Sequence, residues 1–202
     1  MRKSLAVLLC LSLLGGLALP SLAVAEKRID YQQLDAQYGY AFDALDKRWQ
    51  HTHTFTVKYA DATIVLGLTT EGNRTDRVFA PTVLYAQFLD LDGKPLRKIE
   101  KIDVYAANKH YTFKTLIQQD NLSYCLLGTL GRQMLQSFLD AEQITLNLWY
   151  NTDHFTILDV LPEHHATSFK AFAEKTVEED VFAAYPEDLL QRFDTDCGAY
   201  VM

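Results

Sequence analysis

The feature that most constrains the fold lies at residues 144–161, where two β-type runs flank a short turn sequence. In the first run, Ile144 to Tyr150, every second residue is apolar, which is the two-residue period of a half-buried strand. Asn151-Thr152-Asp153 follows, and Asn and Asp favour tight turns. The second run, Phe155 to Leu161, is rich in β-branched and aromatic residues and ends at Pro162. This stretch predicts a β-hairpin, and because an isolated hairpin is marginal, other segments must cover its apolar face.

Three further segments show the three- and four-residue spacing of amphipathic helices. The first begins at Asp30, a suitable N-cap, and carries the aromatic stripe Tyr31, Leu34, Tyr38, Phe42, Leu45 and Trp49. The second runs from about Thr129 to Ala141, with its apolar face continuing back to Leu126 and Leu127. The third follows Pro162 and is marked by Phe169, Phe172, Ala173, Val177 and Phe182. The tail from Tyr185 adds only one amphipathic turn, at Leu189-Leu190-Phe193.

Between the first two helical segments the sequence changes to strand-type runs. The predicted strands cover residues 53–60, 62–69, 77–90, 97–106 and 109–114. Turn signals separate them, including Ala107-Asn108, and Pro81 indicates an edge position or a bulge. Successive strands without intervening helices favour an antiparallel meander. We therefore expect a single α+β domain over residues 26–202, in which an antiparallel sheet, a meander plus the C-terminal hairpin, is packed by about three amphipathic helices.

The N-terminus has the pattern of a secretory signal peptide. Met1-Arg2-Lys3 precedes an apolar run from Leu5 to Leu19, and Ala23-Val24-Ala25 is a small-residue cleavage pattern. The apolar run is shorter than the roughly 20 residues that a membrane span needs. We therefore expect cleavage after Ala25, a periplasmic or secreted soluble protein, and no stable membrane insertion afterwards.

Charge restricts the class of partner. The formal net charge is −7, and removal of Arg2 and Lys3 with the signal would make the chain more acidic. Basic residues cluster only from Lys94 to Lys101, which reads as a solvated segment. Nucleic acid is an unsuitable partner, because Lys and Arg supply most of that affinity.

No local motif of a common enzyme class is present: there is no phosphate-binding loop, nucleophile elbow, His-Glu-x-x-His pair or Cys-x-x-Cys. His51 and His53 would share one face of a strand and are a weak candidate for a metal site. The adjacent pair His164-His165 would point apart on a helix. A Cys125 nucleophile would need a histidine such as His110 or His154. Other catalytic candidates are Ser123, Ser137 or Ser168 in a triad, or carboxylate pairs drawn from Asp61, Glu71, Asp76, Asp90 and Asp92.

Two cysteines remain after Cys10 leaves with the signal, and an even count in an exported chain predicts a disulfide between Cys125 and Cys197. The alternative is two unpaired thiols, with Cys125 serving as a small buried hydrophobe. Gly198 would let the backbone bend beside the second sulfur. The bond would hold the C-terminal tail over the core.

The second half of the chain is similar in its patterning to the small secreted proteins grouped as invasion-associated locus B. The similarity covers residues 102–175 and rests on Asp103, Cys125 and the hydrophobic residues from Leu126 to Phe172. The early Trp-x-x-x-Cys signal of that family is absent. The resemblance therefore carries no functional residue over to this chain.

The sequence favours a non-catalytic envelope protein that binds another envelope protein, a peptide or a small ligand through an apolar groove between sheet and helix. No cofactor is expected. The alternatives are a periplasmic hydrolase with scattered catalytic residues and a metal carrier. Residues that line the main concave site would separate them, since an apolar groove favours binding and converging His, Asp and Ser or Cys side chains favour catalysis.

Overall fold

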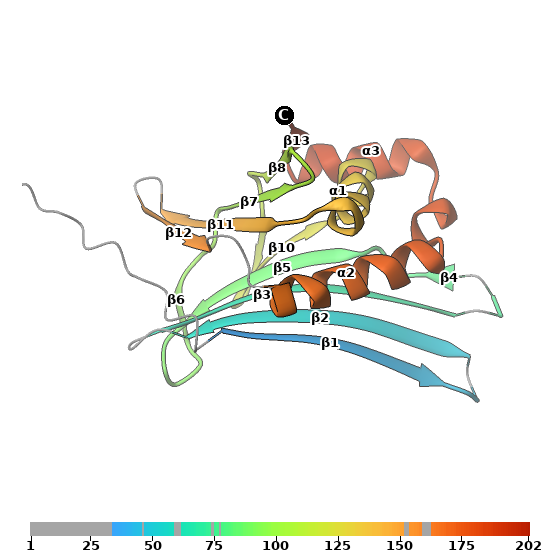
Figure 1. Ribbon diagram of the computed structural model, residues 1–202, viewed down its shortest axis with the longest axis horizontal. Coiled ribbons are helices and arrows are strands. Elements are labelled where there is room, and N and C mark those ends of the chain that lie inside the picture. The colour runs from blue at the N-terminus through green and yellow to red at the C-terminus, as the bar shows by residue number, and fades with distance from the viewer. Residues whose placement is uncertain are drawn as a thin grey trace, which may run out of the picture.

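The computed structural model describes residues 34–45, 47–58, 62–73, 75–76, 78–151, 154–158 and 163–202. It confirms an α+β fold built from antiparallel strands and helices. Figure 1 shows a long, curved first sheet, with helix α2 (Glu163–Glu178) lying along one of its faces and a second sheet on that same side. The predicted signal peptide, the N-cap Asp30, the turn residues Thr152-Asp153 and Pro162 lie outside the described residues.

The first sheet has the strand order β1-β2-β3-β5-β10-β9, with β4 paired to β3 and β6 paired to β5. Its strands are β1 (Leu34–Asp43), β2 (Arg48–Lys58), β3 (Thr63–Asn73), β4 (Val78–Phe79), β5 (Val83–Leu89), β6 (Pro95–Arg97), β9 (Ile117–Gln119) and β10 (Leu122–Leu126). Along β2 the side chains alternate, with Trp49, His51, His53, Phe55 and Val57 buried on the inner face. The sheet therefore presents one continuous inner face to the rest of the molecule.

The predicted N-terminal helix is wrong. Leu34–Asp43 forms β1, which pairs with β2 over its whole length. The aromatic residues Tyr38, Tyr40 and Phe42 are two positions apart, so a helix would spread them around its circumference, whereas a strand places all three on one face. As a strand, this segment forms the edge of the first sheet. Helix α2 contacts both this edge strand and its neighbour β2.

The second sheet has the order β12-β11-β7-β8-β13. Its strands are β7 (Lys101–Ala106), β8 (Lys109–Phe113), β11 (Ile144–Asn151), β12 (His154–Leu158) and β13 (Ala199–Val201). The predicted hairpin is confirmed as the antiparallel pair β11 and β12, and Leu146 and Leu148 are fully buried, as the alternation predicts. Strands that the sequence places in one meander are thus divided between two sheets.

Two local features explain the divisions within the predicted runs. The run 77–90 is broken at residues 80–82, where Pro81 stands between β4 and β5. Ala107 and Asn108 form the predicted reversal between β7 and β8, and both have positive φ, at 50° and 60°. This is the left-handed geometry of a tight hairpin turn. Sequence reasoning missed β10, which pairs with β5, because Leu126 and Leu127 were grouped with the following helix.

Helix α1 (Thr129–Asp140) is capped by a residue far away in the sequence. Gly128 precedes the helix and supplies no side-chain cap, and the amide of Leu130 donates to Oδ2 of Asp194 at 2.9 Å. Asp194 belongs to helix α3 (Glu187–Asp196), which develops from the predicted amphipathic turn in the tail. Burial raises the pKa of Asp194, while hydrogen bonds from the first-turn amides act in the opposite direction. This contact ties α3 to the start of α1.

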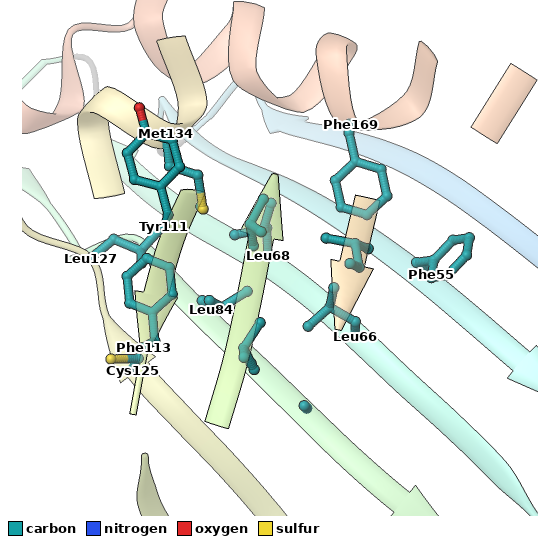
Figure 2. Packing of buried hydrophobic residues seen from close by; sticks show 14 of the residues in the cluster. Phe55, Leu66, Leu68, Leu84, Tyr111, Phe113, Cys125, Leu127, Met134 and Phe169 are labelled. Atoms are coloured by element: carbon teal, nitrogen blue, oxygen red, sulfur yellow. The ribbon is translucent and has the colours of Figure 1, made fainter. Parts of the chain in front are cut away.

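Both sheets and the helices contribute to one hydrophobic core. Phe169 of α2 lies close to Phe55 of the first sheet, with ring centroids 5.8 Å apart. The same cluster contains Leu66, Leu68 and Leu84 of the first sheet, Tyr111 and Phe113 of the second sheet, Met134 of α1 and Leu127 (Figure 2). Tyr111 also bonds Ser137 at 2.7 Å, so its hydroxyl is satisfied inside the core. Within the described residues, no helix is long and apolar enough to cross a membrane.

Cys125 and Cys197 lie at disulfide distance, with 5.7 Å between their Cα atoms and a sequence separation of 72. Both are buried. Gly198 next to Cys197 has φ +54°, the conformation for which glycine is suited, and β13 then pairs with β8. The tail is therefore tied to the second sheet by backbone pairing, and to β10 of the first sheet by the cysteine contact.

Candidate functional site

The main candidate site is a hollow of about 370 Å³ between α1 and α2, which we call the α1–α2 hollow. It is lined by Thr129, Arg132, Gln133 and Gln136 of α1, Thr176 and Val177 of α2, and Asp180, Val181 and Phe182 of the following turn. Val181 and Phe182 are buried and form an apolar floor, while Arg132, Gln136 and Asp180 are exposed around it. The volume is at the lower end of the range for small-molecule sites.

The α1–α2 hollow lies between two helices rather than between sheet and helix, and its lining is mixed. Arg132 and Asp180 bring opposite charges to it, and neither takes part in an ion pair within the described part of the chain. Asp180 has φ 53° and ψ 39°, a left-handed conformation at the start of the short 3₁₀ helix η2 (Val181–Ala184). Asp180 therefore joins α2 to η2 at the edge of the hollow, next in sequence to Val181 and Phe182.

A second polar arrangement occupies the outward side of the second sheet. Ile102, Val104 and Ala106 of β7 face the core, so Lys101, Asp103 and Tyr105 face away from it. We call the outward side chains of β7, β8, β11 and β13, together with Lys114, the outer face of the second sheet. Among the described residues, no helix is drawn over it in Figure 1.

Asp103 is only 2% exposed although it belongs to this outer face. Its carboxylate accepts from Thr112 Oγ1 at 2.6 Å, Trp149 Nε1 at 2.5 Å and Lys101 Nζ at 2.9 Å, and it lies 3.1 Å from His110 Nε2. Burial alone would raise the pKa of Asp103, but the hydrogen bonds from these four partners together lower it. The carboxylate is therefore ionised at neutral pH and organises side chains from three strands.

Aromatic rings surround this carboxylate. Lys101 Nζ lies 3.7 Å above the Trp149 ring, Tyr105 stacks on His110 with ring centroids 4.1 Å apart, and Lys114 Nζ lies 5.4 Å from the Tyr200 ring. Tyr105 and Tyr200 keep 38% and 37% of their surface exposed. The Asp103–His110 pair has the form of a catalytic dyad, but no serine or cysteine of the described residues accompanies it on this face.

His51 and His53 share the inner face of β2, as the sequence predicts, and both are fully buried. His51 Nδ1 lies 3.1 Å from the Tyr38 hydroxyl, and burial raises the pKa of Tyr38 to about 12, so the phenol keeps its proton. His53 Nε2 lies 2.8 Å from Ser168 Oγ on α2, and its ring lies 3.8 Å from that of Phe169. No group of three His, Cys, Asp or Glu side chains suited to a metal occurs in the described residues.

The contact between His53 and Ser168 unites two residues that the sequence analysis treated separately. A triad would require an acid at His53 Nδ1, yet that atom is buried without a hydrogen-bond partner among the described residues. Burial lowers the pKa of His53 to about 3, which makes it a poor base at neutral pH. The pair therefore serves to dock α2 on the first sheet.

The other catalytic candidates are not brought together. Cys125 lies at disulfide distance from Cys197, and a bond between them would leave no thiolate to act as a nucleophile. Ser123 bonds Gln118 and Ser137 bonds Tyr111, both in the interior. Asp90 accepts from the amides of Asp92 and Lys94 and thus stabilises a turn. Asp61 and the side chains of His154, His164 and His165 fall outside the described set.

Sequence reasoning missed Arg132, Asp180 and the role of Asp103. The signal for Asp103 was weak, although an acid alternating with Lys101 and Tyr105 in a strand marks one face. Arg132 and Asp180 line the same hollow only because α1 packs against α2. Comparison with protein-family models, with curated proteins and with solved structures finds no significant match, so no family is assigned, including the one that residues 102–175 resemble.

Proposed function

We propose that this chain is an exported, non-catalytic binding protein whose α1–α2 hollow takes a small zwitterionic ligand, an amino acid or a short peptide with an apolar side chain. The observation that carries the proposal is the pair of opposite charges, Arg132 and Asp180, lining one hollow without an ion pair between them. Arg132 suits a carboxylate, since a guanidinium can donate two parallel hydrogen bonds. Asp180 suits an ammonium group.

The apolar floor supports the same ligand class. Val177 also lines the hollow and is 41% exposed, so an apolar side chain of the ligand would displace water from it, next to the buried Val181 and Phe182. Gln133 and Gln136 add amide groups at the rim that can bond a peptide unit. A ligand with two charges of one sign would be repelled by Asp180 or by Arg132, which favours a zwitterion.

The titration of glycyl-leucine into the purified protein, followed by calorimetry, tests this proposal. We expect saturable binding that weakens when the ligand's amine is acetylated or its carboxylate is amidated. Arg132→Gln should weaken binding of glycyl-leucine by about tenfold, because it removes a charge-assisted contact. It should leave the affinity for the amidated ligand unchanged, since that ligand has already lost the group that Arg132 contacts. Asp180→Asn, which tolerates the same backbone conformation, should behave in the same way toward the acetylated ligand.

The matched control is Arg192→Gln, because Arg192 is exposed on α3 beside Asp196 and does not line the hollow. Absence of saturable binding, or equal binding of the blocked and free dipeptides, would reject the proposal. Recovery of free leucine after incubation would favour the alternative, a periplasmic hydrolase.

Export is a separate part of the proposal and has its own test. The cysteine pair at disulfide distance supports an oxidising compartment. N-terminal sequencing of protein from a periplasmic fraction should read from Glu26. A chain that still begins at Met1 would refute export by this signal.

A further inference from the structure

We infer that the outer face of the second sheet binds a glycan strand whose sugar rings carry occasional carboxylates. This site is separate from the α1–α2 hollow and does not depend on it. The inference rests on three observations: a preorganised buried carboxylate, exposed aromatic rings, and an uncompensated lysine on one face of an otherwise acidic chain.

The first observation is the position of Asp103. It lies on the side of β7 that faces away from the core, yet it is almost completely buried by its own neighbours. Removing an ionised carboxylate from water is costly, and a buried ion pair is often no more stabilising than apolar residues of similar volume. The burial of Asp103 instead orients its neighbours, since its carboxylate contacts Lys101, His110 and Trp149 at once. Side chains held in this way bind a ligand without losing much conformational freedom.

The second observation is the set of rings around it. Tyr105 and Tyr200 are more than one-third exposed, and β7, β8 and β13 place them on one side of the sheet. The apolar faces of sugar rings stack on such side chains, while sugar hydroxyls require donors and acceptors alongside. The exposed Lys114 supplies such a donor on this face. The extended strand surface suits a linear chain of rings.

The third observation is charge. The chain has a formal net charge of −7, but of the described lysine and carboxylate side chains on this face, Lys101 and Asp103 form an ion pair, and Lys114 contributes one uncompensated positive charge. One such lysine is too few for a dense polyanion, because nucleic-acid binders neutralise several phosphates. It matches a polymer with widely spaced carboxylates. The rest of the acidic surface would repel any polymer of higher charge density.

Titration of fluorescently labelled hyaluronan oligosaccharide, which alternates a carboxylated and an N-acetylated sugar, tests the inference at about 0.15 M salt. We expect saturable binding, weaker binding of the neutral chitohexaose, and no binding of a single-stranded oligonucleotide. Lys114→Gln should weaken hyaluronan binding by up to about fivefold. Tyr105→Ser should weaken it by about three- to tenfold.

Two matched controls locate the site. Lys58→Gln changes an exposed lysine of the first sheet, and Tyr40→Ser changes a tyrosine of similar exposure on β1. Neither should alter hyaluronan binding. Circular dichroism of each variant confirms that it is folded, and the test needs no substitution of the buried Asp103.

The other outcomes overturn the inference. If chitohexaose bound as tightly as hyaluronan, the carboxylates would not be recognised. If the oligonucleotide bound more tightly than hyaluronan, the face would be a site for a dense polyanion. Equal weakening by Lys58→Gln or Tyr40→Ser would place the contact elsewhere. Absence of saturable glycan binding would reject the site itself.

Discussion

Substitution of His53 by Gln should remove a large part of the pH dependence of stability. His53 is fully buried on β2, and burial lowers its pKa to about 3, whereas an unfolded histidine titrates near 6.5. Between these two values the unfolded chain binds one proton more than the folded chain does. This contribution to stability is therefore complete above about pH 6.5 and is lost as the pH falls.

The magnitude follows from linkage. Each pH unit within this window costs about 1.4 kcal/mol, so lowering the pH from about 7.5 to about 5 should cost the wild-type chain about 2 kcal/mol through this one residue. That is a substantial share of the roughly 5–15 kcal/mol that stabilises a typical domain. Glutamine cannot be protonated and can still bond Ser168, so the variant should lack this loss although it begins less stable.

Urea denaturation followed by tryptophan fluorescence at both pH values measures the difference. The control is Ser168→Ala, which removes the hydrogen-bond partner but leaves the buried imidazole in place, and should keep the wild-type dependence on pH. If the free energies of unfolding of wild type and His53→Gln change in parallel with pH, burial of a neutral His53 is refuted.

Three further predictions concern stability. Leu148→Ala should lower the free energy of unfolding by about 2–5 kcal/mol, because Leu148 is fully buried. The control Leu91→Ala, at a position that is 71% exposed, should change it by less than about 0.5 kcal/mol. Equal effects of the two variants in urea denaturation would contradict the assigned register. Thiol labelling of the denatured, non-reduced chain beginning at Glu26 should modify neither Cys125 nor Cys197, and two labels per chain would disprove the bond. Cys197→Ser should lower the free energy of unfolding by about 4 kcal/mol. Ala107→Asn should raise stability by about 0.5–1 kcal/mol, since Asn tolerates the positive φ of the β7–β8 turn better than Ala does, and a lower melting temperature would be the contrary result.

Local patterns predicted those elements whose period is unambiguous. The β11–β12 hairpin and the helices from Thr129 and Glu163 follow directly from alternation and from helical spacing. The prediction for the N-terminal segment was wrong because its aromatic residues fit two periods. Tyr38, Phe42 and Trp49 fit the spacing of a helix, while Tyr38, Tyr40 and Phe42 fit the spacing of a strand. Pairing with β2 decided between the two, and pairing partners are not encoded in the local period.

The candidate sites were less predictable than the fold. Arg132 and Asp180 are far apart in sequence and share a hollow only because particular faces of α1 and α2 pack together. Asp103 draws its partners from three strands, and which strands are neighbours depends on how the run of strands divides into two sheets. The proximity of Cys125 and Cys197 was predictable from counting, since only these two cysteines would remain if the predicted signal peptide were removed.

The place of β13 in the second sheet has a consequence for when the protein can fold. This strand, residues 199–201, completes the sheet against β8, and Cys197 reaches back to Cys125, so neither contact can form before nearly all of the described chain has emerged from the ribosome. Contacts between such distant segments slow folding, because long loops must close before the contacts are made. An emerging chain with this topology stays unfolded for longer than one built from local contacts. A translocation pore admits an extended chain, so delayed folding would favour the proposed export.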